Sequence, residues 1–174
     1  LGGDIDRLLD QAWSKPLPPA AQPAAHVMPT RPLEALHYGR GRFVALSRAE
    51  LKSGWKIITP NWAALPGRKR ARFTSLPMLC ADRPGAELTL TFTGSAVGAY
   101  LVAGPDAGIL QARVDDGDFR PVNLYHRYSR GLHYPRTVLF AADLSPGRHV
   151  LTLRTAGDIT SNRRAARIIQ FVAN

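Results

Sequence analysis

Cysteine is nearly absent from this chain. Among 174 residues there is one, Cys80, which excludes an internal disulfide and any zinc site built from cysteines. Cys80 follows Leu79 in a short apolar run, so we expect a buried and unreactive thiol there.

Long hydrophobic runs are missing as well. None reaches roughly 18 residues, the length that a membrane-spanning helix needs, and no signal-peptide pattern opens the chain. We therefore expect no membrane as a partner. The chain begins at Leu1 instead of Met, so we expect a processed product or the end of a longer protein. Its 45% apolar content is enough for one buried core, and its length is too short for two ordinary domains.

The motifs of common catalytic and metal sites are also lacking. No Gly-x-Ser-x-Gly turn and no Gly-Asp-Ser block presents a serine nucleophile. The five histidines include no pair at the spacing of a helical or strand metal site. The segment AGPDAG (103–108) lacks the Lys-Ser/Thr of a phosphate loop, so we interpret it as a connector in which Asp106 caps its own turn. We expect no catalytic residue and no transition-metal ligand in this chain.

Acidic residues are outnumbered by basic ones. Lys and Arg total 23 against 13 Asp and Glu, and only four of the basic residues are lysines. Such an excess favours an anionic partner, such as nucleic acid, an acidic polysaccharide or a lipid headgroup surface. The arginines are scattered along nearly every predicted element, however, so an arginine-rich composition or an acidic neighbouring domain is the favoured explanation.

The N-terminal forty residues divide into a helix and a linker. Five apolar residues within residues 1–14 recur at the spacing of one helical face, which predicts a short helix. They are Ile5, Leu8, Leu9, Ala12 and Trp13. Residues 15–40 are rich in proline and have no period, which predicts an extended linker. Because a lone three-turn helix is marginal in water, its apolar stripe must pack on another surface.

From residue 41 to residue 174, apolar and polar residues alternate. In the run 86–92, Leu88, Leu90 and Phe92 share one face, while Thr89 and Thr91 share the other, which is typical of a half-buried strand. Nine runs of this kind lie at residues 41–47, 71–76, 86–92, 96–103, 109–114, 119–125, 136–142, 149–155 and 166–173. With no second strong helix, they predict an all-β fold, an antiparallel β-sandwich.

The acidic segment VDDGD (114–118) predicts a hairpin turn. Asp116-Gly117 is a two-residue hairpin signal, because a primed turn needs positive φ where glycine is unstrained. In such a turn the neighbouring carboxylates of Asp115 and Asp118 splay apart into solvent. The alternative is a structural calcium site that shares one of them, since calcium takes several oxygen ligands from a loop. No other cofactor is expected.

Aromatic and basic residues crowd the stretch LYHRYSRGLHYPRTVLF (124–140). The period of two fails through its middle, so we expect a loop from Tyr125 to Tyr134 that is followed by a core strand. Rings beside guanidinium and imidazole groups can grip a sugar, stack nucleic acid bases or form a protein interface. The candidate ligand-binding or interface residues are Tyr125, His126, Tyr128, His133, Tyr134 and Arg136. Trp55 and Trp62, in the irregular segment GWKIITPNW, are alternative stacking platforms or buried lids over the sandwich.

Several of these segments together resemble one known accessory module. FTGSAVGAYLVAGPDAG, VDDGDF, YSRGLHYPRTVLFAADLSPGRHVLTLR and the closing ARIIQFVAN are similar to the C-terminal jelly-roll β-sandwich that follows the catalytic domain in bacterial SGNH/GDSL-type hydrolases. These hydrolases belong with carbohydrate and sialate esterases. The opening helix is similar to the last helix of such a hydrolase domain, and the proline-rich segment to its linker.

The resemblance implies an accessory role. The Gly-Asp-Ser and Asp-x-x-His blocks of the family's active site have no match here, so the chain would be the non-catalytic part of a secreted or periplasmic esterase of acylated glycans. It would bind carbohydrate or complete the catalytic cleft, and its helix would pack on the hydrolase domain. The alternatives are a basic β-domain that binds nucleic acid or another polyanion, and a purely structural interdomain module.

Overall fold

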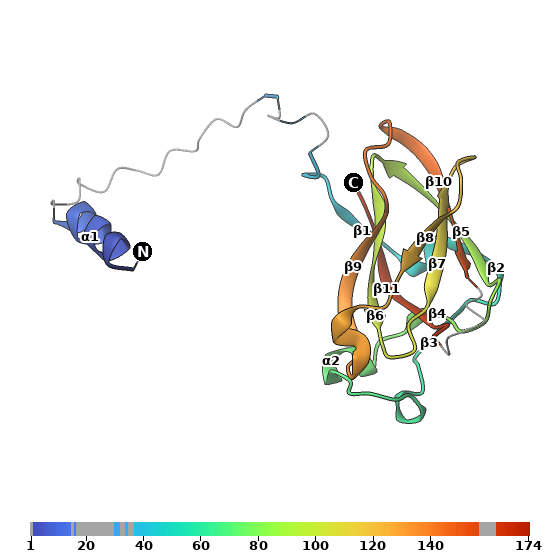
Figure 1. Cartoon of the computed structure of the whole chain (residues 1–174). Coiled ribbons are helices and arrows are strands. Elements are labelled where there is room, and N and C mark those ends of the chain that lie inside the picture. Colours follow the sequence, from blue (N-terminus) through green and yellow to red (C-terminus); the bar gives the residue numbers. More distant parts are fainter. Residues whose placement is uncertain (1, 15, 17–29, 32–33, 35–36, 157–162) are drawn as a thin grey trace. The chain divides into compact units, whose positions relative to one another are not determined.

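The computed structural model describes residues 2–14, 16, 30–31, 34, 37–156 and 163–174. It divides into two compact units, Leu1–Leu33 and Glu34–Asn174, and each is described by itself (Figure 1). In the first unit, α1 (Gly2–Trp13) confirms the predicted helix. Asp4 lies in its first turn, where a carboxylate complements the free amides. Four large apolar side chains of α1 are exposed: Ile5, Leu8, Leu9 and Trp13.

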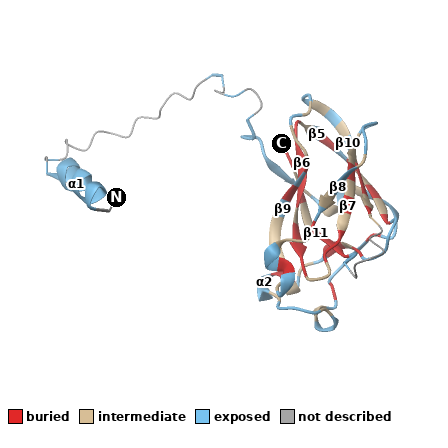
Figure 2. Cartoon of the chain, viewed as in Figure 1, coloured by how far each residue is buried: buried red, intermediate tan, exposed pale blue. Residues whose placement is uncertain are grey.

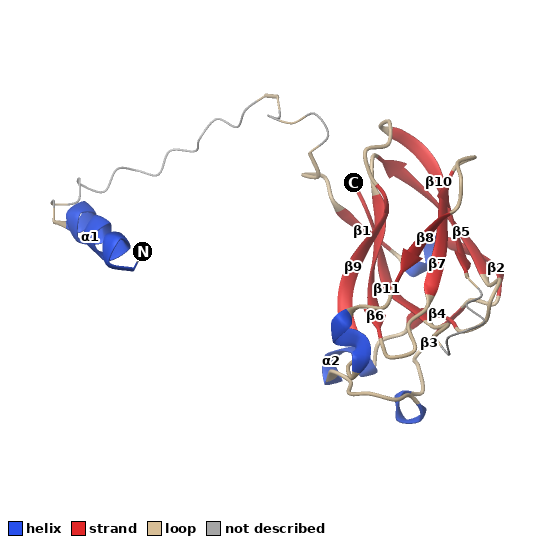
Figure 3. Ribbon diagram, viewed as in Figure 1, coloured by secondary structure: helices blue, strands red, loops and turns tan. Residues whose placement is uncertain are grey.

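The second unit is built from two antiparallel sheets (Figures 1 and 3). Sheet A has the order β3-β4-β11-β6-β9, with β1 also paired to β11, and sheet B has the order β2-β5-β10-β7-β8. The strands of sheet A are β1 (Arg42–Val44), β3 (Lys56–Ile58), β4 (Met78–Ala81), β6 (Val97–Ala103), β9 (Tyr134–Ala141) and β11 (Ala166–Ala173). Those of sheet B are β2 (Ala49–Ser53), β5 (Glu87–Gly94), β7 (Ile109–Val114), β8 (Arg120–Asn123) and β10 (Gly147–Thr155). This arrangement confirms the predicted all-β sandwich.

The main core fills the space between the two sheets. Leu88 and Leu90 of β5 face inward from sheet B, and Leu101 of β6 and Ile168 of β11 face inward from sheet A, all fully buried. The buried residues follow the strands in Figure 2. Alternation along β5 places Thr89 and Thr91 on the opposite face, as the sequence predicts.

A second, smaller core covers part of the outer face of sheet A. Met78 and Val102 alternate with residues of the main core, so their side chains leave the sheet on its other side. Residues 59–77, which we call the lid, pack on them through Phe73 and the partly buried Trp62. The lid contains the short helices η2 (Trp62–Ala64) and α2 (Ala71–Thr74), and α2 lies at the end of the sandwich where β9 begins (Figure 3).

Eight of the nine predicted strands overlap a strand of the structure, whereas the strand predicted at residues 71–76 is wrong. Residues 71–76 form α2 and a turn, because Phe73 and Leu76, three positions apart, pack on the same small core. The sequence analysis also missed β2, β3 and β4. The short β3 is exposed at every position and β4 is buried at most of its positions, so β3 and β4 lack the alternation by which strands were predicted.

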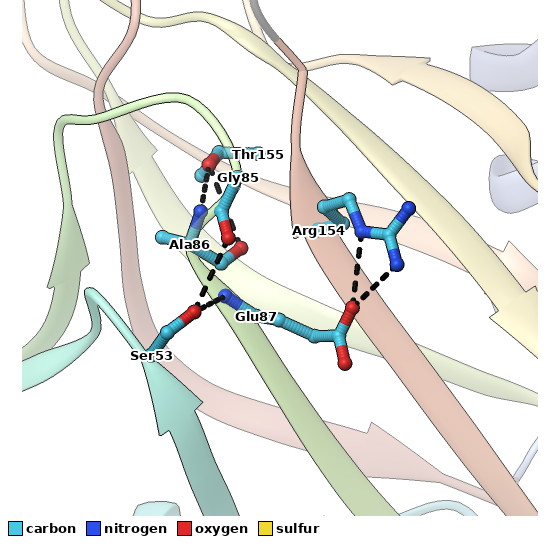
Figure 4. Close-up of polar contacts among 6 residues, drawn as sticks. All are labelled: Ser53, Gly85, Ala86, Glu87, Arg154 and Thr155. Carbon is cyan, nitrogen blue, oxygen red and sulfur yellow. Dashed lines mark hydrogen bonds and ion pairs between the residues drawn. The ribbon is translucent and has the colours of Figure 1, made fainter.

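The start of β5 is fixed by side chains from two neighbouring segments (Figure 4). Thr155 Oγ1 accepts a hydrogen bond from the Ala86 amide at 2.9 Å, and Ser53 Oγ accepts one from the Glu87 amide at 3.2 Å. Arg154 donates to the Glu87 carboxylate from Nε at 3.0 Å and from Nη2 at 2.7 Å. These contacts hold β2, β5 and β10 in one register.

The VDDGD segment differs from the predicted turn. The connection from β7 to β8 is longer than two residues, and the positive φ falls on Asp115, at 52°, which aspartate tolerates better than most residues. Asp115 is also not a free carboxylate, because Oδ1 accepts from the Val150 amide and Oδ2 lies 2.7 Å from His149 Nδ1. His149 Nε2 lies 2.8 Å from the Ser145 carbonyl oxygen. With an acceptor at each nitrogen, the doubly protonated ring fits this site best.

The Asp115–His149 pair predicts a pH-dependent contribution to stability. The hydrogen bond raises the pKa of His149 and lowers that of Asp115. The His149 contribution is full below the unfolded pKa, about 6.5, and is lost as pH rises through the folded pKa; the Asp115 contribution is full above about 3.9 and is lost as pH falls. The Asp115 side chain is 47% exposed, so water screens the pair.

We expect His149→Gln to lower the free energy of unfolding by about 0.5 kcal/mol near pH 6, and by less at pH 9. Urea unfolding at the two pH values measures this difference. His37→Gln, at an exposed histidine with no carboxylate partner among the described residues, is the control. An equal loss for His149→Gln at both pH values would contradict an ion pair.

Candidate functional site

Three rings of the 124–140 stretch come together on the surface. His126 and Tyr134 stack with ring centroids 5.3 Å apart and planes 15° apart. Tyr128 packs against both, at 5.1 Å from His126 and 5.3 Å from Tyr134. Tyr128 is 50% exposed and the other two are half-buried. We call His126, Tyr128 and Tyr134 the aromatic platform.

A short helix positions the platform. The helix η3 (Arg127–Arg130) is capped by His126, whose Nδ1 accepts from the Tyr128 amide at 3.3 Å. The Ser129 hydroxyl, fully buried, accepts from the His126 amide at 3.3 Å. Because His126 Nδ1 accepts this hydrogen bond, Nε2 is the ring nitrogen that can act as a donor. His-x-x-Ser differs from the usual Ser/Thr-x-x-Glu/Gln capping signature, so the sequence carried no recognised signal for this reciprocal cap.

Three arginines contact the stretch that carries the platform. Arg127 donates from Nη2 to the Tyr128 hydroxyl at 2.8 Å, and its guanidinium lies 4.8 Å from the centre of the Tyr128 ring. The Arg163 guanidinium lies 4.5 Å from the centre of the Tyr125 ring, and Tyr125 directly precedes His126 of the platform in the chain. Arg136 points back into the loop and donates to the Leu124 carbonyl at 3.2 Å. Arg127 and Tyr128 thus offer a charged donor beside an exposed ring.

His133 takes a structural position. It is 1% exposed, and its Nε2 lies 2.9 Å from the Pro66 carbonyl of the lid, so this nitrogen carries the proton and donates. Burial lowers its pKa, which keeps the ring neutral. Trp62 contacts the ring edge-to-face, with centroids 5.1 Å apart. His133 therefore joins the loop to the lid and presents no surface to a ligand.

Backbone contacts complete this junction. The Arg68 amide donates to the Gly131 carbonyl at 2.9 Å, and the His133 amide donates to the Arg68 carbonyl at 2.8 Å. The two segments meet as a parallel bridge between Arg68 and Leu132. The loop from Tyr125 to Tyr134, which we call the aromatic loop, is therefore held to the lid by main-chain hydrogen bonds.

A buried ion pair lies beside His133. Arg167 of β11, with a side chain 7% exposed, binds Asp106 through two hydrogen bonds of 2.9 and 2.5 Å. Burial raises the pKa of Asp106, but the hydrogen bonds and charge of Arg167 outweigh this effect and leave the pKa below its usual value. The predicted connector at 103–108 is confirmed, whereas its Asp106 carboxylate serves a partner 61 residues away.

The eight candidate residues therefore have different environments. His126, Tyr128 and Tyr134 form the platform, Tyr125 and Arg136 are partly buried in the same stretch, and Trp62 is a partly buried residue of the lid. Trp55 is 4% exposed and belongs to the main core, so it offers no ring for stacking. Of the two roles that the sequence allowed, it has the buried one. The sequence analysis did not single out Arg127, Ser129 and Arg167, whose partners become visible only in the fold.

Other features of the described residues lie apart from the platform. A pocket of about 390 Å³ opens on the outer face of sheet A, between β3, β4 and the lid, and none of the eight candidate residues lines it. Cys80 lines it, and burial raises the pKa of its thiol to about 11, which keeps it protonated. No three His, Cys, Asp or Glu side chains gather as a metal cage within the described residues. No helix in the same part of the chain is long and apolar enough to cross a membrane.

Known proteins match this chain in fold and not in sequence. No protein-family model and no curated protein matches it. Two structures of a two-domain esterase active on acetylated mannans match with TM-scores of 0.64 and 0.62, at 14% and 13% identity. They cover 97% and 98% of this chain, one of them was co-crystallised with mannopentaose, and this chain covers 44% of each. A family two carbohydrate esterase from Cellvibrio japonicus matches at a TM-score of 0.51 and 12% identity, over 76% of this chain and 33% of its own.

The likeness defines a class of fold. The second unit is a β-sandwich of the jelly-roll type, as the sequence predicts. The chain spans less than half the length of each of these structures. At such identities the likeness shows the fold alone, and the chemistry must be argued from the residues described above.

The close packing of His133 against Gly104 predicts that a side chain at position 104 destabilises the fold. A Cβ on Gly104 would lie 2.3 Å from two atoms of the His133 ring and 2.8 Å from Asp106 Oδ1, so Gly104→Ala must displace both side chains. We expect a loss of about 1–3 kcal/mol in the free energy of unfolding. Gly131→Ala is the control, because a Cβ there meets nothing within 4 Å. Chemical denaturation of both variants measures the difference, and equal stabilities would refute the packing described here.

Proposed function

We propose that this chain is a non-catalytic module of a carbohydrate-active esterase of the SGNH/GDSL type. In this role the aromatic platform contacts an acylated glycan, either alone or as one wall of the catalytic cleft of a hydrolase domain. The parent enzyme would be secreted or periplasmic, where such glycans are met.

The observation that carries this proposal is the composition of the platform. Tyr128 presents a half-exposed ring that can lie against the apolar face of a sugar. Around it, the His126 Nε2 proton and the Arg127 guanidinium are donors for hydroxyl or acyl oxygens. The reciprocal cap of η3 fixes the platform before binding, which reduces the entropy cost of association.

In this proposal the reaction takes place on another domain, because the sequence contains neither a Gly-Asp-Ser block nor an Asp-x-x-His block. The exposed apolar stripe of α1, with Leu8 at 66% and Trp13 at 74% exposure, supports a docking role for this helix on that domain.

The proposal predicts that Tyr128 dominates glycan binding by the platform. We expect Tyr128→Ala to weaken binding of a neutral acetylated mannan oligosaccharide about fivefold, equivalent to the loss of about 1 kcal/mol of ring contact. Isothermal titration calorimetry at low and high salt measures this, and the affinity should hardly change with salt. Tyr38→Ala removes a ring of similar exposure, 51%, elsewhere on the sandwich and should bind as the parent chain does.

Two other results would replace this function with one of the alternatives. Binding of single-stranded oligonucleotides that weakens steeply with salt, without any glycan binding, would favour the nucleic-acid reading of the net charge of +10. Silence towards both ligands would favour a purely structural interdomain module. The coding sequence upstream of Leu1 tests the parentage separately, since a Gly-Asp-Ser block and an Asp-x-x-His block are expected there.

A further inference from the structure

A second concave surface lies where β1 of sheet A meets β5 and β10 of sheet B, and no residue of the platform lines it. It is a groove of about 710 Å³ formed by β1, η1 (Leu46–Arg48), β5 and β10. Thr91 and Thr93, on the outward face of β5, line it, and Arg148 of β10 pairs directly with Thr93. Arg42 of β1 donates to the Thr93 carbonyl, which brings β1 against the edge of the groove. We call this surface the arginine groove.

The charge of the arginine groove has one sign. Arg42, Arg48 and Arg148 line it, and no carboxylate does. None of the three forms an ion pair or a hydrogen bond to a carboxylate within the described part of the chain, in contrast to Arg154 and Arg167. Three unpaired guanidinium groups around one concavity create a positive potential that an anion would relieve.

An exposed ring and free hydroxyls accompany these charges. Phe43 of β1 also lines the groove and is 66% exposed, although it belongs to a strand of a well-packed sandwich. The hydroxyls of Thr91 and Thr93 are exposed, and neither forms a hydrogen bond within the described residues. A ring, two hydroxyls and three guanidinium groups together match a ligand that has apolar C–H faces, hydroxyls and negative charge.

We propose that the arginine groove binds an acidic glycan, with uronate carboxylates paired to Arg42, Arg48 and Arg148 and one sugar ring resting on Phe43. This inference rests on the chain being a glycan-binding module and extends it to a second site for charged sugars. It does not need the aromatic platform to be occupied.

The composition of the groove favours an acidic glycan over the other polyanions. Single-stranded nucleic acid is bound where successive bases stack on several rings along a positive track, and the groove has a single exposed ring. A lipid surface is bound by projecting basic and apolar side chains, whereas these arginines surround a concavity. Uronate residues supply carboxylates for bidentate arginine contacts together with hydroxyls for Thr91 and Thr93.

The experiment compares one glycan with and without its charge. Oligogalacturonate and its fully methyl-esterified form are titrated into the full chain at low and at high salt. We expect the charged form to bind more tightly, with an affinity that falls as salt rises. Arg48→Gln and Arg148→Gln should each weaken binding of the charged form by up to about fivefold, the upper end of the range for exposed ion pairs, and leave the esterified form unaffected. Phe43→Ala should weaken binding of both forms.

Controls separate the groove from general charge and from the platform. Arg120→Gln removes one exposed positive charge outside the groove and should not change the affinity. Circular dichroism and thermal unfolding establish that each variant is folded. Unchanged affinity in the Arg48 and Arg148 variants, or an equal loss in the Arg120 variant, would overturn the arginine groove.

The platform has its own readout in the same assay. One possible result is that Tyr128→Ala loses binding of the neutral glycan, while Arg48→Gln and Arg148→Gln bind the charged glycan as tightly as the unmutated chain. This result would support the proposed function and refute the groove. Tight, salt-sensitive binding of an oligonucleotide or of anionic vesicles that depends on Arg48 and Arg148, without oligogalacturonate binding, would assign the groove to that other polyanion and overturn the proposal.

Discussion

The apolar outer face of sheet A is the constraint on which this end of the molecule depends. Met78 and Val102 leave the sheet on the side opposite the main core, so something must cover them. The lid does so with Phe73 and Trp62, and in reaching across the sheet it brings Pro66 and Arg68 to the aromatic loop. The geometry of the loop is thus a consequence of burying a second core.

Buried polar groups then fix the junction between lid and loop. His133 is neutral and donates to the lid, and the Asp106–Arg167 pair lies next to it with both carboxylate oxygens bonded. A buried charge without a partner would be costly, so the Asp106–Arg167 pair favours this arrangement, while His133 Nδ1 is buried without a hydrogen-bond partner among the described residues. The platform therefore lies beside a junction that main-chain hydrogen bonds and a buried ion pair hold together.

The large positive charge of the chain divides into distinct roles. Arg154 and Arg167 are paired with carboxylates, and Arg113 and Arg163 lie over aromatic rings. These contacts are made within the fold. The three unpaired guanidinium groups of the arginine groove are a small part of the total, and position, not composition, sets them apart.

The sequence by itself determined the elements whose hydrophobic period is local. Helix α1 and most strands follow from spacings of three to four or of two residues, and the loop between Tyr125 and Tyr134 follows from the failure of that period. It also indicated an aromatic cluster, since His126, Tyr128 and Tyr134 are close in the chain. Even so, η3 and its cap are needed to stack them.

Only the tertiary structure decided what depends on partners far apart in sequence. In the structure, residues 71–76 form a helix and a turn instead of the predicted strand, and His133 and Trp55 are buried. Asp106 pairs with Arg167, which is 61 positions away in the chain. Each of these outcomes depends on which sheet face a side chain meets. A one-dimensional pattern records the period of a segment but not the surface that will cover it, and that surface is assigned only when the sheets and the lid pack together.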